Sequence, residues 1–236
     1  MKKYFSLTLP ILLALSICNQ PVAAKPIFNT VVKNSRISSF SGVAVSGNFD
    51  VKIILGNSVG IKINASEETV NSIEARVEND VLVIRYKPHT GWHNQKKVNI
   101  VVNTKMIESL IVSRSGNIKV EGTIKSNSLS TNVSGSGSIT LNTDVSDYTA
   151  IVSGSGKITA IGKAKEAQII LSGSGNFLGD GLYADKAEVK VSGSGNASIA
   201  AEKTLDAMVS GSGNIRYTGN AQVTKSKSGS GSIVRL

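Results

Sequence analysis

The chain has 236 residues and a formal net charge of +10, with 26 Lys and Arg against 16 Asp and Glu. Its 23 Gly are too few for a collagen, and its single Cys excludes a disulfide scaffold. A hydrophobic content of 40% excludes global disorder.

The first 24 residues have the features of a secretory signal peptide. Lys2 and Lys3 precede an apolar stretch from Phe5 to Cys18, and Val22-Ala23-Ala24 fits the −3 and −1 positions of a cleavage site. The apolar stretch is shorter than the roughly 20 residues of a membrane-spanning helix, and no other stretch approaches that length. We therefore expect an exported mature chain without a transmembrane segment, located in the periplasm, at the cell surface or outside the cell.

Cys18 offers an alternative fate for this segment, because bacterial lipoproteins are lipidated on a Cys that ends the signal. Leu15 is suitably placed for such a signal, but Ile17, directly before Cys18, is bulkier than the usual small residue. Plain cleavage after Ala24 is the preferred interpretation, and it leaves a mature chain without Cys. A lipid anchor on Cys18 is the less favoured alternative.

The positive charge of the mature chain is spread evenly. Residues 25–110 hold 11 basic and 7 acidic residues, and residues 111–236 hold 13 and 9. A nucleic-acid binder concentrates its basic residues and interleaves aromatics for stacking, whereas aromatics here are only 5%. We expect no nucleic-acid partner. A mildly basic exported surface could meet anionic glycans or the envelope surface, although a charge that maintains solubility is the simpler explanation.

A tetrapeptide repeat organises the second half of the chain. Ser-Gly-Ser-Gly recurs at nearly constant intervals, and a variant, Ser113-Arg114-Ser115-Gly116, comes one period earlier. The copies begin at Ser134, Ser153, Ser172, Ser192, Ser210 and Ser228. Apolar residues alternate on both sides, as with Ala150 and Val152 before one copy and Ile158 and Ala160 after it. This period of two indicates strands with one buried face and excludes a flexible linker.

The alternation changes phase across each tetrapeptide. Before the tetrapeptide, the inward residues are at positions −3 and −1 relative to its first Ser. After it, they are at positions 6 and 8 of the unit that begins with that Ser, so they change from odd to even positions. The chain must therefore bend at or just after Ser-Gly-Ser-Gly, where Gly permits positive φ and close approach of another backbone. If the serines point inward, they could form hydrogen-bonded stacks along the repeat.

A unit of about 19 residues can bury its apolar face only by stacking on copies of itself, with strands about 4.8 Å apart. We therefore predict an all-β fold, a β-solenoid resembling a parallel β-helix, with about six coils over residues 113–236. The first half should extend or cap the stack, since an open end exposes a sheet edge. Its strand candidates are Val43–Ser46, Phe49–Leu55, Val59–Ala65, Glu74–Val77, Val81–Tyr86 and Val98–Val102.

Three local features complete the N-terminal part. Glu78-Asn79-Asp80 predicts a turn between two strands. Ser66–Ser72 predicts one short helical turn, and Val45–Phe49 is a degenerate copy of the later unit. We expect a linker at residues 25–37 and a single solenoid domain at 38–236. That domain has a strand-rich part at 38–110 and a repeat part at 111–236.

The order of these segments resembles a known family. Strands at Phe49–Ile53, Val81–Tyr86 and Val98–Val102 are followed by Leu-x-Val-Ser-x-Ser-Gly from Leu110 and then by the repeats. Over residues 38–234 this resembles the bacterial family called the putative auto-transporter adhesin, head GIN domain. The resemblance implies an exported, β-helical, non-enzymatic domain with no catalytic motif to carry over.

Candidate chemistry is sparse, and we expect no catalytic residue, cofactor or bound metal. His89, Trp92 and His93 lie between two strand candidates, but no nearby Cys or carboxylate completes a tetrahedral metal site. Lys157 follows a glycine-rich segment, yet Ile158 stands where a phosphate loop needs Ser or Thr. The loop with His89, Trp92 and His93 is the best candidate for a binding protrusion, because loops on rigid scaffolds often carry recognition.

The fifth position of the unit forms a second candidate. It is occupied by Asn117, Ser138, Lys157, Asn176, Asn196, Asn214 and Ser232. Stacking aligns these residues into a polar ladder. In the preferred, structural interpretation, Asn tolerates the bend and its amides bond along the stack. In the functional alternative, Asn176, Asn196 and Asn214 form a strip that bonds sugar hydroxyls.

These observations favour an exported, non-catalytic β-solenoid that acts as a structural or adhesion-type binding module at the bacterial cell envelope. One alternative is an envelope lipoprotein with an accessory or sensing role, which depends on Cys18. Another is a polysaccharide-acting enzyme on a β-helix scaffold, which would need two carboxylates converging on one groove. The repeat offers Ser, Gly, Asn and Thr instead. The domain could also form a homo-oligomer.

Overall fold

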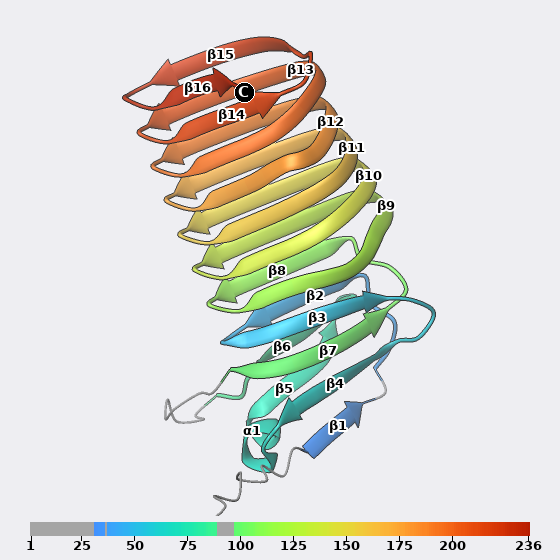
Figure 1. Ribbon diagram of the computed structural model, residues 1–236. Coiled ribbons are helices and arrows are strands. Elements are labelled where there is room, and N and C mark those ends of the chain that lie inside the picture. The colour runs from blue at the N-terminus through green and yellow to red at the C-terminus, as the bar shows by residue number, and fades with distance from the viewer. Residues whose placement is uncertain (1–30, 36, 89–96) are drawn as a thin grey trace, which may run out of the picture.

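A computed structural model describes residues 31–35, 37–88 and 97–236 of the chain. These residues form a β-solenoid with one short helix near its N-terminal end (Figure 1). The elements, in chain order, are β1 (Val31–Ser35), β2 (Gly42–Ser46), β3 (Phe49–Leu55), β4 (Gly60–Ala65), α1 (Glu67–Ser72), β5 (Ile73–Glu78), β6 (Val81–Tyr86), β7 (Val98–Thr104), β8 (Ser109–Arg114), β9 (Asn117–Gly135), β10 (Ser138–Gly154), β11 (Lys157–Gly173), β12 (Asn176–Gly193), β13 (Asn196–Gly211), β14 (Asn214–Thr218), β15 (Gln222–Ser228) and β16 (Ser232–Arg235).

The long strands β9 to β13 each make one coil between successive tetrapeptide corners. Each pairs in parallel with the next, and the register aligns equivalent residues, as Ile139 with Ile118 on one side and Ile158 on the other. The backbone pairing continues through the corners, where Ser155 N donates to the carbonyl oxygen of Gly135 at 2.9 Å. The predicted β-solenoid, with one coil for each tetrapeptide unit, is therefore confirmed.

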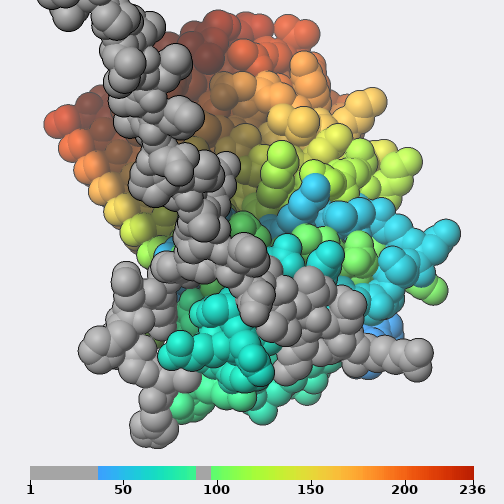
Figure 2. All heavy atoms as spheres, turned by 60° about the horizontal axis from the view of Figure 1, so that its bottom comes forward, coloured from blue at the N-terminus to red at the C-terminus, as the bar shows by residue number. Residues whose placement is uncertain are grey.

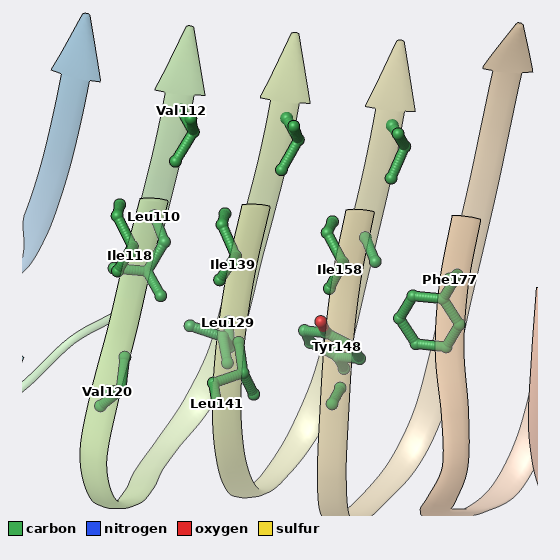
Figure 3. Packing of buried hydrophobic residues seen from close by; sticks show 14 of the residues in the cluster. Leu110, Val112, Ile118, Val120, Leu129, Ile139, Leu141, Tyr148, Ile158 and Phe177 are labelled. Carbon is green, nitrogen blue, oxygen red and sulfur yellow. The ribbon is translucent and has the colours of Figure 1, made fainter. Parts of the chain in front are cut away.

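Each coil bends a second time, opposite the tetrapeptide, and this bend was not predicted. In β10 the buried residues Val145 and Tyr148 are three apart, so the inward phase changes between them. The equivalent pairs are Ala164 with Ala167 in β11 and Ala184 with Ala187 in β12. The two bends divide each coil between a front and a back layer, and the apolar side chains fill the space between them (Figure 3).

The core is built from rows of like side chains along the stack. Ile118, Ile139, Ile158 and Phe177 form one such row in neighbouring coils and are at most 1% exposed (Figure 3). Full burial of a side chain of this size contributes about 1.5–3 kcal/mol, so each coil stabilises its neighbours. Tyr148 is also in the core, and desolvation raises the pKa of its phenol far above the usual range.

The tetrapeptide corner places glycine inside and serine outside. The second Gly of each Ser-Gly-Ser-Gly copy is buried, whereas both serines of every copy are exposed. The inward serine stacks are therefore wrong, because the phase that turns the second Gly inward turns both serines to solvent. The first Gly bears the strained geometry: Gly173 has φ +108, and a Cβ added to it would lie 2.7 Å from the carbonyl oxygen of Gly154.

The N-terminal part extends both layers of the stack. The degenerate copy at Val45–Phe49 forms a partial coil, because β2 pairs in parallel with β8 and β3 pairs in parallel with β9. Beyond it, β7, β4 and β1 continue one layer, while β6 and β5 continue the other. The stack thus begins before the six coils predicted from the tetrapeptides alone.

Helix α1 lies where the two layers end (Figure 1), at the end of the stack that is turned toward the viewer in Figure 2. Its Val70 is 3% exposed, and the hydroxyl of the N-cap Ser66 accepts a hydrogen bond from the backbone N–H of Thr69. The predicted turn is also present, with Asn79 at φ +49 and Asp80 at φ +65 between β5 and β6. Extension and capping by the first half are therefore confirmed.

Strand β1 lies within residues 25–37, the segment expected to be a linker, and it pairs antiparallel with β4. The expected signal peptide and Cys18 lie outside the described residues. Among the residues that the structure does describe, no helix is long and apolar enough to cross a bilayer.

Candidate binding site

The polar ladder at the fifth unit position is present and is bonded along the stack. Asn196 donates its Nδ2 to Oδ1 of Asn176 at 3.2 Å, and Asn214 donates in the same way to Asn196 at 2.9 Å. The Ser232 hydroxyl then donates to Oδ1 of Asn214 at 2.6 Å. Each amide oxygen in this run accepts from the next coil, as the structural interpretation expected.

A second run of the ladder lies nearer the N-terminal cap. Asn117 donates to Oδ1 of Asp50 at 2.7 Å, and the Ser138 hydroxyl donates to Asn117 at 2.7 Å. Lys157 stands between the two runs. All three candidate residues Asn176, Asn196 and Asn214 are only partly exposed, and binding of sugar hydroxyls by them stays a prediction.

The other predicted candidates, His89, Trp92 and His93, lie outside the described residues, so their part in binding also stays a prediction. Within residues 31–35, 37–88 and 97–236, no cluster of three His, Cys, Asp or Glu could hold a metal ion.

A depression lies at the second bend of the coils and was not anticipated. We call it the bend groove. It has a volume of about 580 Å³ and crosses five coils, from β9 to β13. It is lined by Ser126, Asp144, Val145, Ser146, Lys163, Ala164, Lys165, Tyr183, Ala184, Asp185 and Glu202. The buried Ala164 and Ala184 are register partners in neighbouring coils.

A β-bulge brings Tyr183 to the bend groove. The register between β12 and β11 shifts between Thr159 and Ile161 of β11. The register between β12 and β13 shifts between Gly179 and Tyr183 of β12. The bulge is anchored, because the Ser198 hydroxyl donates to Asp180 at 2.8 Å and accepts from the backbone N–H of Gly179 at 3.3 Å. Tyr183 follows the bulge and is 53% exposed. Bulges commonly re-aim a side chain beside a functional site.

Exposed apolar side chains gather around the same bulge. Ile161 is 49% exposed and Leu178 is 37% exposed. Ile161 pairs with Gly181, and Tyr183 lies two residues further along the same strand, so Ile161 and Tyr183 are diagonal neighbours. Such diagonals lie about 7–8 Å apart, within reach of an aromatic ring. The exposed Ile161 therefore lies next to Tyr183, although it does not itself line the bend groove.

The charges of the bend groove are mixed. Lys163 and Lys165 of β11 form no ion pair with any residue that the structure describes, and the same holds for Asp144 of β10. Asp185 is engaged, since it accepts from Lys203 Nζ at 2.9 Å. Donors and acceptors without partners thus lie beside the exposed ring of Tyr183.

A smaller depression of about 340 Å³ lies further along β10 to β12, and four of its polar side chains are paired with one another. Lys186 donates to Glu166 at 2.8 Å, and Gln168 donates to Glu188 at 2.7 Å. Lys190 also bonds Glu188, and these bonds lower the pKa of that carboxyl. We therefore regard this region as a stabilising cross-strand network and the bend groove as the candidate site.

One signal in the sequence marks the bulge. The interval from Ser172 to Ser192 is longer than either of the next two, from Ser192 to Ser210 and from Ser210 to Ser228. The extra length of this coil must be absorbed, and Gly179 and Gly181 flank the place where it is. The sequence does not show that the extra length falls beside a row of alanines at a second bend.

Comparison with known proteins agrees with this architecture. The sequence model of the family described as "Putative auto-transporter adhesin, head GIN domain" matches residues 39–221. No curated protein matches the chain.

Solved structures share the fold. A putative adhesin from Bacteroides fragilis has a TM-score of 0.82 at 20% identity, covering 88% of this chain and 97% of its own. A putative lipid binding protein from Parabacteroides distasonis has a TM-score of 0.72 at 25% identity, with the same two coverages. A putative adhesin from Parabacteroides distasonis has a TM-score of 0.73 at 23% identity, again with the same coverages. These β-solenoids therefore correspond to almost the whole of the described chain.

Proposed function

Since the chain belongs to the family of the putative auto-transporter adhesin, head GIN domain, we propose that it is a non-catalytic, adhesion-type binding module of the bacterial cell envelope. We further propose that it binds a glycan in the bend groove. The observation that carries this proposal is the exposed Tyr183 beside the unpaired groups of Lys163, Lys165 and Asp144. A ring with polar groups around it is suited to a ligand that has both apolar faces and hydroxyls.

The rigidity of the scaffold supports a role in binding. The bend groove is built on strands that pair on both sides, and its floor residues Ala164 and Ala184 are at most 6% exposed. Groups held on regular elements lose little entropy when a ligand binds, so a shallow groove can still bind with useful affinity. The predicted signal peptide at residues 1–24 supports export to the envelope.

Carboxylates do line the bend groove, but their surroundings favour binding over glycoside hydrolysis. Asp144 and Glu202 are exposed, and Asp185 is held by Lys203. A general acid in a glycosidase needs a desolvated carboxyl that stays protonated near neutral pH. None of these three side chains is enclosed in that way.

A lipid ligand is the second candidate, favoured by the exposed Ile161 and Leu178 and by the description of one structural relative as a putative lipid binding protein. The bend groove itself argues for the glycan. Lysines and carboxylates line it around the buried Ala164 and Ala184. An acyl chain would need an apolar cavity in place of these charges.

The test is a glycan array probed with residues 25–236, followed by a reducing-end assay on each glycan that binds. Flotation with phosphatidylcholine and phosphatidylglycerol vesicles is measured in parallel. We expect binding to one or more glycans, no release of reducing ends and no flotation. Release of reducing ends would establish the enzyme alternative. Flotation without glycan binding would establish the lipid alternative, and absence of all binding would refute a binding module.

A further inference from the structure

We infer that the ligand of the bend groove is a neutral pyranose chain, with one sugar ring stacked on Tyr183. This inference rests on the proposed function and specifies its ligand class. Three features support this ligand: the exposure of Tyr183 after the bulge, the residues next to Tyr183 and the balance of charges in the bend groove.

The fold does not require the exposure of Tyr183. Its register partner in β11 is the exposed Lys163, so a charged residue is accommodated at this row in the neighbouring coil. Tyr148, by contrast, is 1% exposed and its ring packs near that of Phe177, with centroids 6.3 Å apart. A half-exposed ring beside a groove offers a flat apolar surface to a ligand.

A pyranose ring matches this surface because one of its faces carries several C–H groups and its rim carries hydroxyls. The C–H face can pack on the Tyr183 ring, and its diagonal neighbour Ile161 adds exposed apolar surface beside that ring. The hydroxyls can then donate to the Asp144 carboxylate and accept from the ammonium groups of Lys163 and Lys165. A purely apolar ligand would leave these three groups unsatisfied.

The charge balance selects a neutral sugar over an acidic one. Lys163 and Lys165 face three carboxylates along the bend groove, those of Asp144, Asp185 and Glu202. Lys203 neutralises Asp185, so the groups around the groove sum to about zero. A polyanion would gain little attraction here and would meet the remaining carboxylates, since like charges close together are unfavourable.

The length of the bend groove fits a chain of sugars. It runs from Ser126 in β9 to Glu202 in β13, which is four strand spacings. At about 4.8 Å per spacing, this is on the order of 19 Å along the stack. A single monosaccharide would occupy only part of that length, so an oligosaccharide should bind more tightly than its monomer.

Isothermal titration of residues 25–236 tests the inference, with cellohexaose, mannohexaose and chitohexaose as neutral probes and hexagalacturonic acid as the acidic probe. The variants are Tyr183→Ala, Tyr183→Phe and the control Met208→Ala, which removes an exposed apolar side chain from β13 outside the bend groove. Circular dichroism confirms that each variant is folded. We expect a neutral hexasaccharide to bind, with affinity about tenfold lower in Tyr183→Ala and within about threefold of the original in the other two.

Each other result overturns a distinct part of the reasoning. Equal binding by Tyr183→Ala and the original chain refutes stacking on Tyr183 but leaves the proposed function standing. A preference for hexagalacturonic acid that disappears at high salt refutes a neutral ligand. If none of the four probes binds and no glycan bound on the array is a neutral pyranose chain, the ligand class is wrong. If the array gives no hits either, the proposed function fails as well.

Discussion

Substitution of the first corner glycine should test the architecture most directly. We predict that Gly173→Val and Gly193→Val each destabilise the fold, because both glycines have positive φ, at +108 and +114. A Cβ at Gly173 would lie 2.7 Å from the carbonyl oxygen of Gly154, and one at Gly193 would lie 2.5 Å from that of Gly173. The obstruction is backbone of the neighbouring coil, which cannot move without disturbing the ladder.

The magnitude has two parts. A β-branched residue at such a φ costs about 1–3 kcal/mol in backbone strain. The added side-chain volume costs about 1–3 kcal/mol more, because the coils must separate locally. The expected loss is therefore about 2–6 kcal/mol, a large part of the roughly 5–15 kcal/mol that stabilises a typical domain. For a domain of this size it corresponds to a fall in Tm on the order of 10 °C.

The assay is thermal and urea unfolding followed by circular dichroism. The matched controls are Ser172→Val and Ser174→Val, which add a comparable volume to the same tetrapeptide at exposed positions. Exposed substitutions of this kind should stay within about 0.5 kcal/mol of the original stability. If the glycine variants unfold at the same temperature as the serine controls, the corner geometry described above is wrong.

Two further predictions concern the polar ladder and the carboxylates. Asn196→Ala removes hydrogen bonds to both Asn176 and Asn214 and should lower the free energy of unfolding in urea by about 1–2 kcal/mol, whereas the exposed control Asn64→Ala should change it little. Glu188 has a folded-state pKa below its ordinary value of 4.5, with Lys190 as the first cause. The stability that Glu188 contributes to the fold is therefore fully present above pH 4.5 and is lost as the pH falls through its lowered folded-state pKa. The urea midpoint of unfolding should therefore fall as the pH is lowered through this range. Glu188→Gln should make the urea midpoint depend less steeply on pH. An unchanged dependence on pH would contradict the role of this carboxyl.

The N-terminal part shows how far sequence patterns reach. Alternation predicted β3 and β6 with the bounds that the structure has, and Ser66 and the Asn79–Asp80 pair marked the helix start and the turn. Local patterns of this kind depend on backbone preferences of a few residues, so they can be recognised without knowledge of the fold. They did not show that β7 and β4 extend one layer while β6 and β5 extend the other, because pairing between distant segments leaves no local mark.

The candidate site was the least predictable part. His89, Trp92 and His93, and the ladder residues Asn176 and Asn196, were prominent because they are rare or periodic in the sequence. The bend groove has neither property, since its members come from five coils and include alanines and lysines that look unremarkable singly. Only their alignment across the stack makes them neighbours.

The sequence by itself determined the coil. A tetrapeptide that recurs at nearly constant intervals with alternating apolar flanks requires stacked strands, because no single unit can bury its own apolar face. Tertiary structure alone decided which residues face solvent at the corner, where the second bend falls and where the bulge before Tyr183 projects. The first two depend on how successive coils pack against one another, and the third depends on how the excess length of one coil is absorbed between its neighbours. All three are properties of the packed stack, which no single repeat contains.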